Sequence, residues 1–155
     1  SGVLYAGLML TDSGPKVIEF NCRLGDPETQ VILPRLESDL LEIVHRAALS
    51  ELEQTEIVWN DLACVGVVSA SGGYPETHRT GFEITGLDAI DPSATVFHAG
   101  TQPTESTNPV TSGGRVLTVT GTGKTLAEAT AAAYDNTARI AFDGRYHRTD
   151  IAANL

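Results

Sequence analysis

The sequence predicts an α+β fold in two parts, in which antiparallel strands and helices are followed by a smaller α+β domain. Short apolar runs separated by turn residues indicate the strands, and two helix-start patterns indicate helices between them. The pattern changes after a polar stretch at residues 50–60, beyond which short strands predominate. With 155 residues, 41% of them apolar, the chain can form one ordinary domain and part of another.

The first element expected is a β-hairpin. Residues 2–10 form an apolar run typical of a buried strand, and residues 16–22 resume as a second strand. Between them, residues 11–15 are a cluster of Thr, Asp, Ser, Gly and Pro, which favours a turn.

Two helices are expected next. Asp26 can cap a helix that begins at Pro27 and ends or bends near Pro34. Ser38 and Asp39 open a second helix, in which one set of residues has the spacing of a buried stripe. This stripe consists of Leu40, Val44, Ala47 and Ala48.

The polar stretch at residues 50–60 suggests a domain boundary, which divides the chain into residues 1–52 and 53–155. In the second part, strands are expected at residues 63–70, 95–99 and 115–120. A last helix is expected from Thr125, where Glu128 completes a capping box, to about Phe142.

Charge and composition exclude some classes of protein. Ten basic and twenty acidic side chains give a formal charge of −10, which disfavours nucleic acid as a partner. No apolar run is long enough to span a membrane. Cys22 and Cys64 lack the spacing of metal ligands or of a redox pair, so two buried thiols in a reducing cytoplasmic protein are expected.

A polar row on the second strand carries the clearest chemical pattern. Side chains alternate along a strand, so Glu19, Asn21 and Arg23 are expected on one face. The other face, expected to anchor the strand in a core, carries Ile18, Phe20 and Cys22. Carboxylate and amide oxygens suit Mg²⁺ held together with substrate phosphates, and a guanidinium suits a transferring phosphoryl group. The spacing alone fits a solvated sheet face equally well.

The residues that follow the row favour the functional interpretation. Residues 19–28, Glu-Phe-Asn-Cys-Arg-Leu-Gly-Asp-Pro-Glu, resemble the signature of the phosphoribosylamine–glycine ligases, which belong to the ATP-grasp superfamily. Further stretches that resemble this family occur in order along nearly the whole chain. They are residues 2–9, 72–75, 98–101, 113–117 and 148–151.

The resemblance implies the end of an ATP-grasp domain followed by a small α+β C-terminal domain. It implies that the full enzyme joins glycine to 5-phosphoribosylamine, using ATP and Mg²⁺ or Mn²⁺, through glycyl phosphate. Glu19 and Asn21 then correspond to nucleotide and metal ligands, Arg23 to a catalytic residue, and Asp26 and Glu28 to substrate-binding residues. The N-terminal part of the same enzyme becomes the expected partner, and this chain alone is expected to be inactive.

Several alternatives stay open. Asp26 fits a helix cap, and Glu28 fits a first helical turn whether or not it binds a ligand. Residues 121–125 weakly resemble a phosphate-binding loop, although Thr125 is better explained as a cap. His98 is expected to be buried and hydrogen-bonded. At the level of the whole protein, the alternatives are another ATP-grasp carboxylate–amine ligase and a non-catalytic acidic interaction module.

Overall fold

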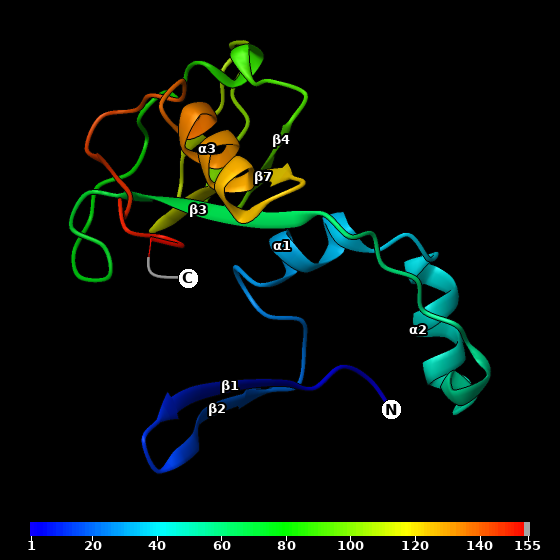
Figure 1. Ribbon diagram of the computed structural model, residues 1–155. Helices are drawn as coiled ribbons and strands as arrows, with labels where there is room; N and C mark the ends of the chain where they lie inside the picture. The colour runs from blue at the N-terminus through cyan, green and yellow to red at the C-terminus, as the bar shows by residue number, and fades with distance from the viewer. Residues whose placement is uncertain (154–155) are drawn as a thin grey trace. The chain divides into compact units, whose positions relative to one another are not determined.

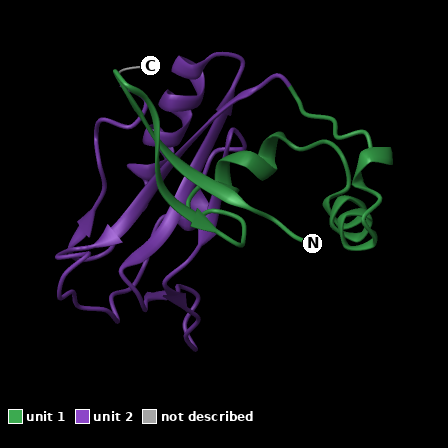
Figure 2. Ribbon diagram, turned by 90° about the horizontal axis from the view of Figure 1, so that it is seen from below, with its two compact units in different colours: residues 1–60 green, residues 61–155 purple. Residues whose placement is uncertain are grey.

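The computed structural model describes residues 1–153 and divides the chain into two compact units. Unit 1 comprises residues 1–60 and unit 2 begins at residue 61 (Figure 2). Within residues 1–153, no helix combines the length and the apolar character needed to cross a bilayer.

Unit 1 begins with the expected hairpin. Strand β1 (Tyr5–Thr11) pairs antiparallel with β2 (Gly14–Asn21), as Figure 1 shows. The tight turn between them requires a positive φ at Gly14 (98°), which glycine adopts without steric cost. The hydroxyl of Thr11 donates to the Gly14 carbonyl at 2.7 Å and so closes the turn. The hairpin is therefore confirmed, although β1 starts at Tyr5 and not at residue 2.

The helices of unit 1 confirm one predicted cap and contradict the other. Asp39 caps α2 (Leu40–Leu49), because its carboxylate accepts from the backbone N–H groups of Leu41 and Glu42. The helix α1 is short, Thr29–Ile32, and continues as a 3₁₀ turn, η1 (Leu33–Arg35). The N-cap position of α1 is Glu28 and no side chain caps it, so the prediction that Asp26 caps this helix was wrong. A second 3₁₀ turn, η2 (Leu52–Gln54), follows α2.

The predicted buried stripe of α2 is exposed. Leu40 is 37% and Val44 is 42% exposed, and no residue of α2 is buried. Among the described residues, the buried hydrophobic side chains begin at Val65. The spacing therefore identified an apolar face correctly, but unit 1 contains no element that covers it.

Unit 2 is built on a four-stranded antiparallel sheet in the order β4-β7-β3-β8. Its strands are β3 (Ala63–Ser71), β4 (Ala94–His98), β7 (Arg115–Gly123) and β8 (Arg145–Tyr146), the first three of which match the predicted strands. The unit also contains β5 (Thr101–Gln102), β6 (Val110–Thr111) and a 3₁₀ turn, η3 (Leu87–Ala89).

Helix α3 (Leu126–Thr137) packs on strands β3 and β7 (Figure 1). Its small side chains Ala129 and Ala133 are completely buried, and they form one core cluster with Val65 and Val67 of β3. A Cβ atom on Gly121 of β7 would lie 2.4 Å from backbone atoms of Ala129 and Ala133. The glycine therefore allows the helix backbone to approach the strand directly.

The start of α3 is as predicted, whereas its end is earlier. Thr125 accepts from the N–H of Glu128, whose carboxylate accepts from the N–H of Thr125, so the capping box is confirmed. The helix ends at Thr137 and not near Phe142. Ala141 beyond it exchanges backbone hydrogen bonds with Thr85, a pairing that a continuing helix would prevent.

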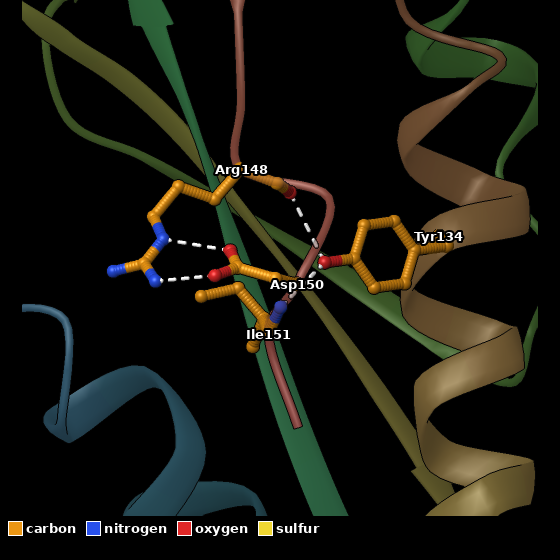
Figure 3. A network of polar contacts seen from close by, with 4 residues as sticks. All are labelled: Tyr134, Arg148, Asp150 and Ile151. Atoms are coloured by element: carbon orange, nitrogen blue, oxygen red, sulfur yellow. Dashed lines mark hydrogen bonds and ion pairs between the residues drawn. The ribbon is translucent and has the colours of Figure 1, made fainter. Parts of the chain in front are cut away.

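Residues 148–151 are hydrogen-bonded to helix α3 through Tyr134 (Figure 3). The Tyr134 hydroxyl donates to the Arg148 carbonyl and accepts from the Ile151 N–H, both at 3.0 Å. Between these two points, the Arg148 guanidinium donates to both oxygens of Asp150, at 2.8 and 2.7 Å. These hydrogen bonds lower the pKa of Asp150.

Replacing Gly121 by Ala should destabilise unit 2, because the added methyl group meets the backbone of α3. We expect the free energy of unfolding to fall by about 2 kcal/mol, measured by urea denaturation followed by circular dichroism. Ala131→Leu, on the exposed side of the same helix, is the control and should change it by less than about 0.5 kcal/mol. Equal stability of Gly121→Ala and the unsubstituted chain would contradict the close packing.

Replacing Arg148 by Ala should raise the pKa of Asp150 towards the ordinary value of an aspartate, because the two charged hydrogen bonds are lost. Carboxyl ¹³C NMR titration measures this directly. A lowered native pKa contributes stability above the unfolded-state pKa, and that contribution disappears as the pH falls through the native value. Arg148→Lys keeps the charge without the paired geometry and should give an intermediate value. An unchanged pKa in Arg148→Ala would reject the ion pair.

Candidate functional site

The site begins with two residues on one face of β2. The Asn21 side-chain N–H donates to Oε1 of Glu19 at 2.9 Å, so the two side chains lie together, and their predicted shared face is confirmed. In the hairpin register, Glu19 pairs with Gly7 and Asn21 pairs with Tyr5. A Cβ atom on Gly7 would lie only 3.3 Å from Cγ of Glu19, so the glycine leaves space for the Glu19 side chain.

The opposite, apolar face does not enter a core, contrary to the prediction. Ile18 is 63% and Phe20 is 60% exposed, and Cys22 is an exposed free thiol. The pairing shifts between Gly7 and Leu8, where Glu19 and Val17 are the partners and Ile18 is the extra residue of a bulge. Unit 1 again provides no element over its apolar side chains.

Arg23 lies beyond the strand, so strand alternation does not place it. Strand β2 ends at Asn21, and Arg23 occupies the bend that follows. Its guanidinium is exposed and donates to the carbonyl of Leu24 at 2.8 Å. The prediction that Arg23 continues the strand face was therefore wrong.

The loop after β2 brings a second carboxylate towards β1. The pKa of Tyr5 is raised, first by hydrogen bonding to the Glu28 carboxylate, and burial and the charges of Glu28 and Glu19 act in the same direction. Asp26 accepts a hydrogen bond from the Gln30 side chain at 3.1 Å. No sequence pattern singled out Tyr5. Its position opposite Asn21 could have been found only by working out the hairpin register.

This arrangement provides oxygen ligands of the kind that Mg²⁺ and Mn²⁺ accept. The Asn21 amide nitrogen is directed at Oε1 of Glu19, which leaves the amide oxygen and the second carboxylate oxygen as ligands. The described residues contain no group of three or more His, Cys, Asp or Glu side chains arranged to hold a metal. The pair therefore fits a metal that is also held by phosphate oxygens, and it does not form a complete metal site by itself.

Two other sequence candidates are explained by local structure. In the weak phosphate-loop pattern, the backbone N–H groups of Lys124 and Thr125 both donate to the Glu128 carboxylate, so they are not directed at a ligand. His98 is exposed and not buried as predicted, and its Nδ1 lies 3.0 Å from the hydroxyl of Thr101.

Comparison with known proteins connects both units to one enzyme family. The family model described as "Phosphoribosylglycinamide synthetase, C domain" matches residues 64–154. The model described as "Phosphoribosylglycinamide synthetase, ATP-grasp (A) domain" matches residues 1–29, which contain Glu19, Asn21 and Glu28.

Individual relatives agree with these matches. Phosphoribosylamine–glycine ligase of Halalkalibacterium halodurans is 48% identical over 99% of this chain and 35% of its own length. The enzyme of the same name from Streptomyces coelicolor is 53% identical over 99% of this chain and 38% of its own length. The crystal structure of phosphoribosylamine–glycine ligase from Thermotoga maritima aligns with a TM-score of 0.73 and 37% identity, over 96% of this chain and 36% of that one.

The chain thus spans little more than a third of the length of these relatives. Its α+β fold, with antiparallel sheets and an ATP-grasp fragment before a C-terminal domain, agrees with these matches. The chain belongs to the phosphoribosylglycinamide synthetase family and corresponds to its C-terminal portion.

Proposed function

We propose that the whole protein containing this chain joins glycine to 5-phosphoribosylamine at the expense of ATP. A glycine carboxylate oxygen attacks the γ-phosphorus, and ADP leaves. The amine nitrogen of 5-phosphoribosylamine then attacks the carbonyl carbon of the glycyl phosphate, with loss of a proton and of inorganic phosphate. The names of the relatives support this reaction, and the paired Glu19 and Asn21 are the structural observation that carries it.

Each candidate site residue has a role in this proposal. Glu19 and Asn21 hold the nucleotide through a divalent cation, Mg²⁺ or Mn²⁺. Arg23, exposed at the end of β2, stabilises charge on the acyl phosphate or on the glycine carboxylate. Asp26 and Glu28, in the loop that follows, recognise the amine substrate. When bound, the divalent cation neutralises charge on the phosphate oxygens during phosphoryl transfer.

The remaining part of the enzyme is the proposed partner of the exposed hairpin. In this proposal residues 1–52 complete an ATP-grasp domain, residues 53–155 form the C-terminal domain, and the protein is cytoplasmic. The exposure of Ile18 and Phe20 supports a covering partner, because exposed apolar patches commonly mark interaction surfaces. This chain alone is then inactive, because unit 1 contributes only part of the nucleotide site.

In the full-length protein, Glu19→Gln should reduce metal-dependent turnover on the order of 100-fold, because a charged ligand near the transferring phosphoryl group is lost. The measurement is release of phosphate that depends on glycine, with ATP, Mg²⁺ and 5-phosphoribosylamine present. Absence of such release from the folded unsubstituted protein would reject the proposed reaction.

Two variants serve as controls for that experiment. Glu53→Gln makes the same chemical change at an exposed position in η2, and His98→Gln alters an exposed residue of unit 2. Both should retain turnover within about twofold, since surface substitutions usually have small effects. If they reduce turnover as much as Glu19→Gln does, the site assignment is wrong.

Hydrogen exchange tests the proposed partner separately. Amides of β1 and β2 should exchange quickly in the isolated chain, where the apolar side chains are exposed, and at least about tenfold more slowly in the full-length protein. The amides of β7, whose residues from Val116 to Gly121 are buried within unit 2, should exchange similarly in both. Equal exchange of β1 and β2 in the two proteins would argue against a covering partner.

A further inference from the structure

Unit 2 contains a cavity of about 310 Å³ between residues 72–82 and residues 143–144. Ligand pockets in proteins commonly measure about 300–1,000 Å³, so this cavity is large enough for a small molecule. Its two walls meet closely, because a Cβ atom on Gly72 would lie 2.7 Å from the carbonyl oxygen of Gly144. Strands β3 and β8 pair beside this contact and therefore fix both walls at one end of the cavity.

Residues 72–82 form a loop whose backbone is held at several points. A Cβ atom on Gly73, which has a φ of 96°, would lie 2.4 Å from the carbonyl oxygen of Thr77. At the far end of the loop, the N–H of Phe82 donates to the Thr111 hydroxyl at 3.1 Å. The loop therefore has a defined shape before any ligand binds, which lowers the entropic cost of binding.

A guanidinium without an acceptor lies in this cavity. Arg79 stands over the Phe82 ring, 5.4 Å from its centroid, and its side chain has no hydrogen-bond acceptor or ion-pair partner among residues 1–153. By contrast, the guanidinium groups of Arg46 and Arg148 pair with carboxylates. In a chain with twenty acidic and ten basic side chains, Arg79 thus keeps all its N–H donors for a ligand.

Further polar groups line the same cavity. Thr77 supplies a hydroxyl, and His78 supplies an imidazole whose Nδ1 lies 2.9 Å from the Glu76 carbonyl oxygen. Because a carbonyl only accepts, Nδ1 carries a hydrogen, and Nε2 remains for a ligand as a donor when the ring is protonated. On the other wall, the Asp143 carboxylate also lacks a hydrogen bond or ion pair within the described part of the chain. The cavity therefore offers donors on one wall and an acceptor on the other.

We propose that this cavity binds a phosphate monoester of a sugar. The planar guanidinium of Arg79 matches phosphate oxygens, and Thr77 and His78 add donors beside it. The Asp143 carboxylate accepts hydrogen bonds from sugar hydroxyl groups. A small zwitterion such as glycine would pair only with Arg79 and Asp143 and would leave most of the cavity empty. The inference concerns unit 2 alone and does not rest on the proposed function.

Titration of ribose 5-phosphate into the chain, followed by ¹H–¹⁵N NMR, tests this site. We expect saturable shifts of the backbone amides of residues 72–82 and 143–144, with a Kd of about 1 mM. Arg79→Gln should weaken binding at least about tenfold, because a charge-assisted hydrogen-bonded pair is lost. Lys124→Gln removes the same charge at an exposed position outside the cavity and should bind as the unsubstituted chain does. The absence of shifts in the two loops, or full affinity in Arg79→Gln, would overturn the proposal.

A second comparison separates the sugar from its phosphate. Inorganic phosphate should bind about tenfold more weakly than ribose 5-phosphate, and Asp143→Asn should weaken only the sugar phosphate, about threefold. Equal affinity for the two anions, with no effect of Asp143→Asn, would indicate an adventitious ion only and would reject the proposal. Displacement of ribose 5-phosphate by glycine would reject it as well.

Thr77→Val provides an independent variant in case Arg79→Gln disturbs the loop. It removes one donor at nearly constant volume and should weaken binding of ribose 5-phosphate about threefold. The amide spectrum outside residues 72–82 should remain that of the unsubstituted chain. Unchanged affinity in a folded Thr77→Val chain would contradict the assignment of this wall to the phosphate.

Discussion

The antiparallel register of β1 and β2 is the constraint on which the candidate site depends. It places Gly7 opposite Glu19 and Tyr5 opposite Asn21, so that one strand carries the candidate ligands and the other leaves space for the Glu19 side chain. The bulge at Ile18 lies directly beside this region and shifts the pairing by one residue. Because each one-residue slip moves every side chain to the other face, the site requires this register and not merely the presence of two strands.

Unit 2 depends on a different constraint, which is the packing of helix α3 on its four-stranded sheet. The close approach at Gly121 brings two alanines of α3 into a core cluster with Val65 and Val67, while Ile84, Leu117 and Ile140 fill the other cluster. The glycines of residues 121–125 therefore have a structural explanation. Close packing of a helix on a strand and binding of a phosphate both require residues without side chains. A short glycine pattern between a strand and a helix therefore does not distinguish the two.

Sequence patterns predicted the elements whose causes are local. The cap at Asp39, the capping box of Thr125 and Glu128, and the shared face of Glu19 and Asn21 all depend on neighbours within a few residues. Periodicity identifies an apolar face but not what covers it, so it could not predict whether that face is buried. The side chains that were expected to be buried and are exposed are Ile18, Phe20, Leu40 and Val44. The position of Tyr5 opposite Asn21 was missed for a related reason, since it follows from the hairpin register and not from a local motif.

The open hairpin also affects how the chain behaves in solution. Leu10 is 82% exposed and Phe20 is 60% exposed on a two-stranded sheet, and each of its strands has an edge without a partner among the described residues. Exposed apolar edges act as templates for further strands, so concentrated samples of the isolated chain should be prone to aggregation unless the formal charge of −10 keeps the molecules apart. Because added salt screens this repulsion, association through the same two strands that form the candidate site should increase with ionic strength.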